Sequence, residues 1–324
     1  MTAIPLRVPR AASAVRPSWD DLPGEVRDAI VQRAGSAVRQ AVSQGGGFTS
    51  GFASRLELQD GRRLFVKAAT SERHVFARPS YEREAAVVQG LPAAVPTPRV
   101  LWALDLGAWF VSAFEDVEAR HPLRPWDPAE LSAVLDVCVL LAEELTPVPG
   151  TLPEPHPLSE WDDEFSFWRR RSGGDHEALG VPLAKLWAQR VDDLAAAEAS
   201  WIEQCAGATG LHFDLRDDNL LVRPDGSVLV CDWNHLTLGA PWLDLAALLV
   251  SVHGDGLDAD ALWEASPLTD GVDDDALVAF LAALAGFFVG AAAQEDMAGS
   301  PYLRQHQGWW RDASLSWLDS RLRG

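Results

Sequence analysis

Three side chains with the chemistry of phosphoryl transfer lie close together in the run LHFDLRDDNLLVRPDGSVLVCDW, residues 211–233. Asp214 is followed five positions later by Asn219 and, thirteen positions after that, by Asp232. A carboxylate such as Asp214 can accept the proton of an attacking hydroxyl group. Carboxylate and amide oxygens are suitable ligands for Mg²⁺ bound to nucleotide phosphates. Because phosphoryl transfer depends mainly on positioning and charge neutralisation, this set of residues predicts a phosphoryl-transfer site.

A β-hairpin must bring Asn219 and Asp232 together. Residues 220–222 and 227–231 are strand-like, and the Pro-Asp-Gly sequence at 224–226 is typical of a turn. A hairpin of this length returns both of its ends to one side, so that two oxygen ligands would face one ion. The alternative is an ordinary surface hairpin, because Asp and Asn favour turns in any protein.

The first part of the chain is expected to form a small β-sheet with one or two helices. The glycines at 45–47 should end a first helix, and Asp60-Gly61 is a strong hairpin signal between two strands, the second of which carries Lys67. The expected elements are a helix over 20–44, strands ending at residue 58 and over 63–68, a helix over 83–91, and strands over 100–104 and 108–114.

Beyond residue 116 the chain is expected to be mostly helical. The expected helices cover residues 128–145, 160–171, 182–204, 243–252 and 274–293, and the hairpin described above interrupts them. Strands followed by helices favour two α+β lobes with a cleft between them. The expected division is a loose, flexible N-terminal arm over residues 1–18, a nucleotide-binding N-terminal lobe over 19–115, and a helical C-terminal lobe over 116–324.

The composition limits the class of partner. At 324 residues, with 48% hydrophobic and 23% charged residues, the chain is expected to be globular. Its formal net charge is −20, and residues 225–300 hold thirteen Asp or Glu and no Lys or Arg. Such a field argues against nucleic acid as a partner and favours a cationic one. The alternative is that the acidic surface serves solubility alone.

Two features bear on the cellular location. Three scattered cysteines, Cys138, Cys205 and Cys231, form no zinc motif and favour a reducing cytoplasm. The uncharged run at 276–293 is at the short limit for a helix that crosses a bilayer. Because acidic residues flank this run on both sides, we expect a buried helix of the helical lobe and no membrane association.

In the order of these elements, the sequence resembles the aminoglycoside phosphotransferase family, whose members have a protein-kinase-like fold. The resemblance runs from about Trp19 to the C-terminus. It is specific at four places, which are the Gly-rich turn at 45–51, FVK ending at Lys67, the helix with Glu84, and HFDLRDDN…CDW. The resemblance implies an α+β fold of two lobes, with a small mixed β-sheet in the first lobe and mostly helices in the second.

The resemblance also implies roles around the expected cleft. Asp214 would be the catalytic base, and Asn219 and Asp232 would hold Mg²⁺. Arg216 stands where serine/threonine protein kinases have a catalytic-loop lysine, so it could neutralise charge on the transferred phosphoryl group. The alternative for Arg216 is a salt bridge to one of the two Asp residues that follow it.

Further residues would hold the nucleotide or support the catalytic loop. Lys67 would contact the α- and β-phosphates, and Glu84 on the next helix would hold Lys67 in place, with Glu82 as the competing partner. His212 would brace the catalytic loop, and Asp244 matches a family position that supports this loop.

The nucleotide's two ends would meet different segments. Thr49 and Ser50 lie where loop hydroxyls and backbone N–H groups can reach phosphates. Backbone groups near Glu115 and Val117 would hold adenine or guanine. One departure from the family is Phe213, which stands before the catalytic Asp where the family often has Gly.

These observations predict a cytoplasmic, Mg²⁺-dependent enzyme that moves the γ-phosphoryl group of ATP or GTP to a hydroxyl group of a small molecule. The acidic stretch favours a cationic acceptor, such as an aminoglycoside. The absence of an activation-loop signature argues against a protein kinase. The alternatives are a kinase of a neutral, macrolide-like or primary-metabolite substrate, and an inactive binding protein with a kinase-like fold. The sequence does not predict an oligomeric state.

Overall fold

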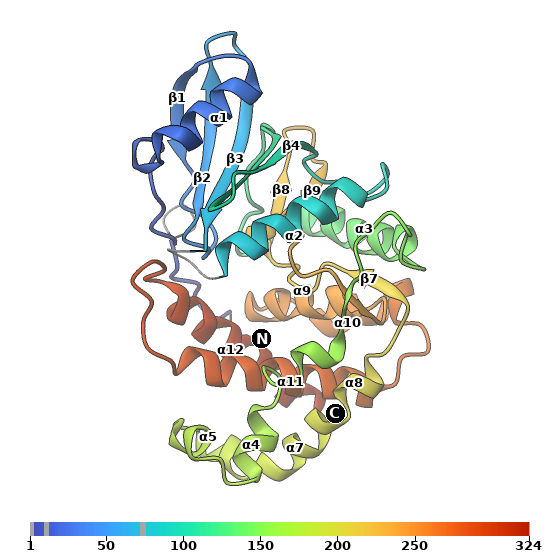
Figure 1. Cartoon of the computed structure of the whole chain (residues 1–324). Helices are drawn as coiled ribbons and strands as arrows, with labels where there is room; N and C mark the ends of the chain where they lie inside the picture. Colours follow the sequence, from blue (N-terminus) through green and yellow to red (C-terminus); the bar gives the residue numbers. More distant parts are fainter. Residues whose placement is uncertain (1–2, 10–12, 72–75, 324) are drawn as a thin grey trace.

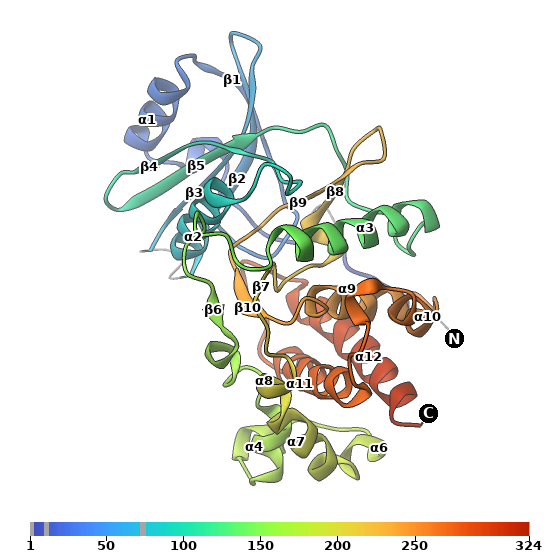
Figure 2. The ribbon, with the colours of Figure 1, turned by 90° about the vertical axis from the view of Figure 1, so that its right-hand side faces the viewer.

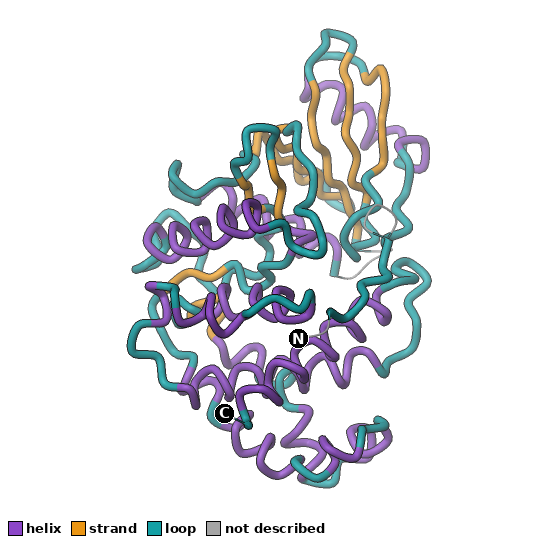
Figure 3. The backbone as a smooth tube through the Cα atoms, turned by 180° about the vertical axis from the view of Figure 1, so that it is seen from behind, coloured by secondary structure: helices purple, strands orange, loops and turns teal. Residues whose placement is uncertain are grey.

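Two lobes of different composition make up the protein. The structure is a computed structural model that describes residues 3–9, 13–71 and 76–323. Within this part of the chain the long strands gather in one lobe and most of the helices in the other (Figure 1; Figure 3). The predicted α+β architecture of two lobes is confirmed.

The N-terminal lobe is built on one five-stranded sheet with the order β1-β2-β3-β5-β4. All neighbouring strands in it are antiparallel, so the expectation of a mixed sheet was wrong. Short connections such as the turn at 60–61 suit antiparallel pairs, whereas a parallel pair needs a long crossover. The strands are β1 (Val38–Ser43), β2 (Phe52–Leu58), β3 (Arg63–Thr70), β4 (Val100–Asp105) and β5 (Trp109–Glu115).

The first helix is shorter than expected. Helix α1 covers Gly24–Ala34, and residues 38–43 of the predicted 20–44 helix form β1 instead. The helix ends because Gly35 adopts a left-handed conformation with φ of 72°, which is a common helix stop. Pairing with β2 then makes residues 38–43 an edge strand despite their helical spacing. Helix α2 (Ala77–Gly90) begins six residues before the predicted 83–91 helix and ends one residue earlier, and it carries Glu84.

The helical lobe has four long helices. Helices α3 (Pro128–Glu144), α9 (Leu243–Gly254) and α11 (Asp274–Ala292) match the predicted segments closely, whereas α12 (Leu303–Arg321), which packs on α11 and α9, was not foreseen. The predicted 182–204 helix is divided into three short ones. The shorter helices are α4 (Phe167–Ser172), α5 (His176–Gly180), α6 (Lys185–Ala188), α7 (Val191–Ala199), α8 (Trp201–Gln204) and α10 (Ala259–Glu264).

Short strands and 3₁₀ turns connect these helices and carry the catalytic loop. The predicted hairpin is present as β8 (Leu220–Val222) and β9 (Val228–Val230), which lie between the sheet and the helical lobe (Figure 2). The remaining elements are β6 (His156–Pro157), β7 (Thr209–Leu211), β10 (Thr237–Gly239), η1 (Trp19–Asp21), η2 (Leu158–Trp161), η3 (Asp217–Asn219) and η4 (Pro267–Thr269).

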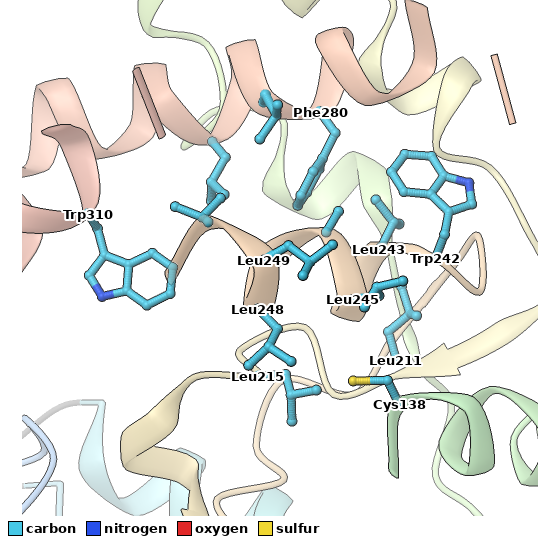
Figure 4. Close-up of a cluster of buried hydrophobic side chains, with 14 of the residues drawn as sticks. Cys138, Leu211, Leu215, Trp242, Leu243, Leu245, Leu248, Leu249, Phe280 and Trp310 are labelled. Atoms are coloured by element: carbon cyan, nitrogen blue, oxygen red, sulfur yellow. The ribbon is translucent and has the colours of Figure 1, made fainter. Parts of the chain in front are cut away.

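The core of the helical lobe surrounds α9 and α11. Leu248 and Leu249 of α9 are fully buried, and Phe280 of α11 lies above α9 in the view of Figure 4. Helix α11 is long and apolar enough to cross a membrane, yet 72% of its apolar window is buried inside the lobe. It therefore has the burial expected of a core helix.

The N-terminal segment was expected to be a loose arm, but its described residues pack against both lobes. The backbone N–H of Ile4 donates to the Gly254 carbonyl at 2.7 Å, and the indole of Trp309 donates to the Ile4 carbonyl at 2.9 Å. At the other end of the segment, Ala14 N donates to Gly45 O at 3.0 Å. The segment thus joins the helical lobe to the Gly-rich turn.

Candidate active site

A cavity of about 440 Å³ lies in the cleft between the sheet and the catalytic loop. It has the size of a small-molecule site. Its walls contain most of the residues selected from the sequence, and these are Thr49, Lys67, Glu84, Glu115, Val117, Asn219 and Asp232. The structure therefore brings residues that are far apart in the chain around a single volume.

Lys67 forms two ion pairs inside this cavity. Its Nζ lies 2.6 Å from Glu84 Oε2 and 2.9 Å from Asp232 Oδ1. Glu84 rather than Glu82 is the partner, because Glu82 pairs with Arg78 on the outer side of α2. The ammonium group is thereby held between the helix of the N-terminal lobe and the end of the hairpin.

The ionisation of this cluster is set by burial and by the Lys67 charge. Burial alone would lower the pKa of Lys67, but Asp232 and Glu84 raise it above its usual value. For Asp232 burial has the opposite effect and would raise the pKa, yet the neighbouring Lys67 lowers this pKa to about 2. Asp232 is therefore an anion at neutral pH, as a metal ligand must be.

The catalytic loop places Asp214 and Asn219 in direct contact. The Asn219 side-chain amide donates to the Asp214 carbonyl at 2.8 Å and to Asp214 Oδ2 at 3.0 Å. Burial raises the pKa of Asp214, while Arg216 opposes this effect. Arg216 lies 3.1 Å from Asp214 and 3.2 Å from Asp218. Arg216 thus forms the salt bridge with a following Asp that was the alternative expectation. It also lies beside Asp214, as a role in transfer would require.

Two buried side chains hold the catalytic loop. Asp244 Oδ2 and Oδ1 accept the N–H groups of His212 and Phe213, each at 2.8 Å. His212 Nε2 lies 2.9 Å from the Cys231 carbonyl, and Asp214 N donates to its Nδ1 at 3.3 Å. Burial lowers the pKa of His212, so a neutral imidazole links the loop to the end of β9. This geometry agrees with the supporting roles expected for His212 and Asp244.

Backbone strain is concentrated at the same place. Among the described non-glycine residues, Phe213 and Asp232 have positive φ angles of 61° and 68°. Such conformations are costly for residues with a Cβ and often mark functional sites. Phe213 precedes Asp214, the expected catalytic base, where the family often has Gly. The two hydrogen bonds to Asp244 hold the backbone at residues 212 and 213 in this shape.

The donor set at the end of the hairpin fits Mg²⁺. Because the Asn219 amide nitrogen is held by Asp214, its side-chain oxygen is turned to the opposite side, where Asn219 lines the cavity. No described group of three or more His, Cys, Asp or Glu forms a metal cage. A site with one carboxylate and one amide oxygen suits Mg²⁺, which commonly completes its shell with water and substrate phosphates.

Only some of the residues expected to contact the nucleotide are placed to do so. Thr49 lines the cavity, whereas Ser50 lies against Gly299 of the helical lobe. Glu115 and Val117 line the far end, but the Glu115 N–H already donates to the Arg99 carbonyl at 3.0 Å. The N–H of Glu115 therefore stabilises the N-terminal lobe and does not bind the adenine or guanine ring.

Sequence reasoning missed a group of three charged residues at this far end. The Asp116 side chain is only 2% exposed and lies 3.2 Å from Arg55 and 3.3 Å from Arg63. Arg55 also donates to the Val117 carbonyl at 3.2 Å. These arginines come from β2 and β3, and only sheet pairing shows that they meet the segment after β5. The available indication in the sequence was that side chains alternate between the two faces of a strand, so that Arg55 and Arg63 could share one face of the sheet.

Aromatic side chains beside Asp214 were also missed. The Trp161 ring centroid is 5.2 Å from the rings of both Phe213 and His235. Burial lowers the pKa of His235, whereas Asp214 and Asp232 oppose that shift, so His235 is close to both carboxylates. No local motif connects Trp161 with this loop, because it reaches the site through the 3₁₀ turn η2.

The acidic stretch at 225–300 does not form one wall. Asp255 is buried in a pair with Arg124, and Asp258 caps α10. Asp273 precedes the start of α11, whereas Glu295 and Asp296 follow its end. With 19 residues, α11 separates these two groups by roughly 28 Å. The acidic residues of this stretch are therefore not gathered on one surface. Gly299 and Ser300, which follow Glu295 and Asp296, contact Ser50 and Phe48 of the Gly-rich turn.

The fold and this site define a kinase-like small-molecule phosphotransferase. Residues 47–284 match the model of the phosphotransferase enzyme family. The protein belongs to this family, and the resemblance to aminoglycoside phosphotransferases is confirmed. No curated protein sequence matches the chain.

Solved structures of similar shape are antibiotic kinases. Aminoglycoside phosphotransferase APH(4)-Ia is 15% identical, with a TM-score of 0.58 over 92% of this chain and 97% of that one. Spectinomycin phosphotransferase APH(9)-Ia, in complex with ADP and spectinomycin, is 14% identical, with a TM-score of 0.56 over 90% and 93%. Amicoumacin kinase hAmiN, in complex with AMP-PNP, Ca²⁺ and its antibiotic, is 12% identical, with a TM-score of 0.54 over 89% and 95%. At these identities the likeness shows the fold alone.

Proposed function

We propose that the enzyme transfers the γ-phosphoryl group of ATP or GTP, with Mg²⁺, to a hydroxyl group of a small molecule in the cytoplasm. The observation that carries this proposal is the arrangement of Lys67, Asp232 and Asn219 around one cavity, with Asp214 in hydrogen-bond contact with Asn219. Similar proteins of known structure bind ADP or AMP-PNP together with antibiotics. An inactive binding protein would not need the contact between Asn219 and the carboxylate of Asp214.

In the proposed mechanism each residue has one task. Lys67, held by Glu84, contacts the α- and β-phosphates, and Asn219 and Asp232 hold Mg²⁺, which supplies positive charge to the phosphate oxygens. Asp214 orients the acceptor hydroxyl and takes its proton. The hydroxyl oxygen bonds to the γ-phosphorus while the bond from that phosphorus to the bridging oxygen breaks, releasing the nucleoside diphosphate. Arg216, beside Asp214, offsets the negative charge of the transferred group.

For the acceptor, we propose a cationic molecule such as an aminoglycoside. The supporting observations are the net charge of −20 and the two exposed carboxylates of Glu295 and Asp296, which precede the contact of Gly299 and Ser300 with the Gly-rich turn. A second candidate is a neutral acceptor with a flat or apolar face, because Trp161, Phe213 and His235 form an aromatic group beside Asp214. Aromatic faces bind either neutral rings or cations.

A transfer assay with a panel of hydroxylated acceptors tests the function. ATP and GTP are each offered with Mg²⁺, and the acceptors include aminoglycosides, macrolides and amino sugars. We expect a phosphorylated acceptor to form with the wild-type enzyme and not with Asp214→Asn. Nucleotide binding without transfer to any acceptor across a broad panel would favour the inactive binding protein instead.

A further inference from the structure

The Gly-rich turn is held from outside by the N-terminal segment. Ser13 Oγ donates to the carbonyls of Gly47 at 2.7 Å and Gly45 at 3.2 Å, and Ala14 N donates to the same Gly45 carbonyl at 3.0 Å. Three consecutive glycines have no side chains that could fix their own conformation. The hydrogen bonds from the segment therefore supply the order that the turn lacks. The segment precedes residue 47, where the match to the family model begins.

Arg16 makes the most extensive of these contacts. One of its terminal nitrogens donates to Gly46 O at 2.7 Å, and the other donates to Gly51 O at 3.0 Å and to the Tyr81 hydroxyl at 3.1 Å. A single planar guanidinium thus connects the start of the turn, its end and helix α2. Such a fork can hold three acceptors at fixed relative positions, which a flexible ammonium does less well.

The connection through Tyr81 reaches the phosphate-binding lysine. Tyr81 is 1% exposed, and its ring centroid lies 5.2 Å from Lys67 Nζ. Gly51 packs so closely on this ring that an added Cβ would lie 2.7 Å from it. Both Arg16 and Tyr81 line the nucleotide cavity. Arg16 therefore fixes the turn relative to the same helix that holds Lys67 through Glu84.

The direction of the carbonyl groups gives these contacts a consequence for binding. In a trans peptide unit the N–H of the next residue points opposite to the carbonyl. Carbonyls of Gly45, Gly46 and Gly47 that point to the segment thus turn the following N–H groups, at residues 46–48, away from it. Successive N–H groups that point the same way form an anion site. Because the turn is already ordered, phosphate binding does not have to overcome the entropy cost of ordering it.

We propose that Arg16 is a positioning residue, which holds the Gly-rich turn in the shape that binds the nucleotide phosphates. This inference rests on the proposed binding of nucleotide at this cavity. It adds a function for the N-terminal segment, namely that residues 13–16 are part of the nucleotide site although they lie before the first strand.

Binding of AMP-PNP with Mg²⁺, measured by calorimetry on the full chain, tests the proposal. For Arg16→Gln we expect the dissociation constant of AMP-PNP to rise about ten-fold, because the charge-assisted hydrogen bonds that hold the turn are lost. The acceptor KM and the melting temperature should change little. Arg7→Gln is the matched control, because Arg7 is an exposed arginine of the same segment, and it should bind as the wild type does. Arg16→Lys should recover only part of the lost affinity.

Three results would overturn the proposal. Equal affinity in Arg16→Gln and the wild type would remove Arg16 from nucleotide binding. Full recovery in Arg16→Lys would show that charge alone matters and not the three fixed contacts. A uniform loss of both substrates' binding together with a lower melting temperature would show a general structural role. A wild-type protein that binds no nucleotide would instead contradict the proposed function, so the two failures are distinguishable.

Tyr81→Phe provides a second test if Arg16→Gln does not fold. It removes one acceptor of the guanidinium but keeps the ring beside Lys67. We expect a few-fold weaker binding of AMP-PNP, because one hydrogen bond of the three is lost. If Arg16→Gln does fold, its effect and that of Tyr81→Phe should not add in the double variant, since they act through one contact. Additive effects would contradict the proposal.

Discussion

Lys67 Nζ lies 2.9 Å from Asp232 Oδ1, so that the expected phosphate-binding cation and the expected metal-binding anion neutralise each other. When nucleotide and Mg²⁺ bind, each of the two side chains must exchange part of this contact for its own ligand. The pair therefore keeps two buried charges compensated in the free protein. It also positions both groups at the point where the phosphates would lie.

The two proposed metal ligands should differ in importance. Asp232→Ala and Asn219→Ala should both raise the Mg²⁺ concentration needed for half-maximal activity, and Asp232→Ala should raise it more because the carboxylate also supplies charge. Asp225→Ala is the control, because Asp225 is exposed at the tip of the same hairpin. A titration with Mg²⁺ checks this prediction. An unchanged metal requirement in both site variants would show that the hairpin has only a structural role.

Replacing Lys67 with Arg should impair activity although the charge is kept. The point charge of an ammonium reaches Glu84 and the phosphates together, whereas the larger planar guanidinium would displace one of them. We expect kcat/KM for ATP to fall on the order of 10²-fold, comparable to the loss of one donor in a preorganised site. Lys185→Arg is the matched control, because Lys185 is the other lysine of the chain and is exposed. Steady-state kinetics at saturating acceptor compare the two variants.

Asp214→Asn should abolish transfer while it leaves nucleotide binding intact. The amide fills the same space but cannot take the hydroxyl proton, and the loss of a general base typically costs about 10²- to 10⁴-fold. Single-turnover measurements together with AMP-PNP binding check both parts. A variant that turns over at a near-normal rate would exclude Asp214 as the base.

The same residue gives the activity a defined pH dependence. The base must be ionised, and burial raises the pKa of Asp214 above its usual value. Activity should therefore fall as the pH drops through this raised pKa, at a higher pH than an exposed aspartate would give. Arg216 opposes the shift, so Arg216→Gln should move the acidic limb of the kcat/KM profile to still higher pH. A limb that moves to lower pH would contradict this arrangement.

The sequence predicted the site better than it predicted the elements around it. Asp214, Asn219 and Asp232 follow one another on a loop and a hairpin, so local spacing was enough to bring them together. Contacts that depend on tertiary packing were beyond such reasoning. The edge strand β1 was taken for a helix because only its pairing with β2 distinguishes the two, and the place of Trp161 depends on how the helical lobe folds back.

The acidic stretch shows the same limit and leads to a stability prediction. Asp255 belongs to the acidic stretch that favoured a cationic acceptor, but its side chain is 4% exposed and pairs with Arg124 at 2.6 Å. Asp255→Asn should lower the free energy of unfolding by about 3 kcal/mol, because it leaves a buried Arg without its full counter-charge. The acceptor KM should not change.

Asp258→Asn is the control for this change. Asp258 is exposed and caps helix α10 through a hydrogen bond to Ala261 N, and Asn is an equally good cap. Thermal or denaturant unfolding of the two variants should therefore show a loss of stability only for Asp255→Asn. Equal stability of both variants would mean that the buried pair with Arg124 contributes little.

Added salt should weaken the binding of a cationic acceptor. The net charge of −20 favours protonated amines over anions. The exposed carboxylates of Glu295 and Asp296 precede the contact of Gly299 and Ser300 with the Gly-rich turn. Exposed ion pairs are individually weak, about 0–1 kcal/mol each, and are screened over roughly 8–10 Å near physiological salt. The acceptor KM should therefore rise between low and high salt, and less so in a Glu295→Gln, Asp296→Asn double variant. For a neutral acceptor held by Trp161, the acceptor KM should instead be independent of salt. Such a result, measured with nucleotide saturating, would contradict the cationic acceptor and leave the phosphotransferase proposal intact.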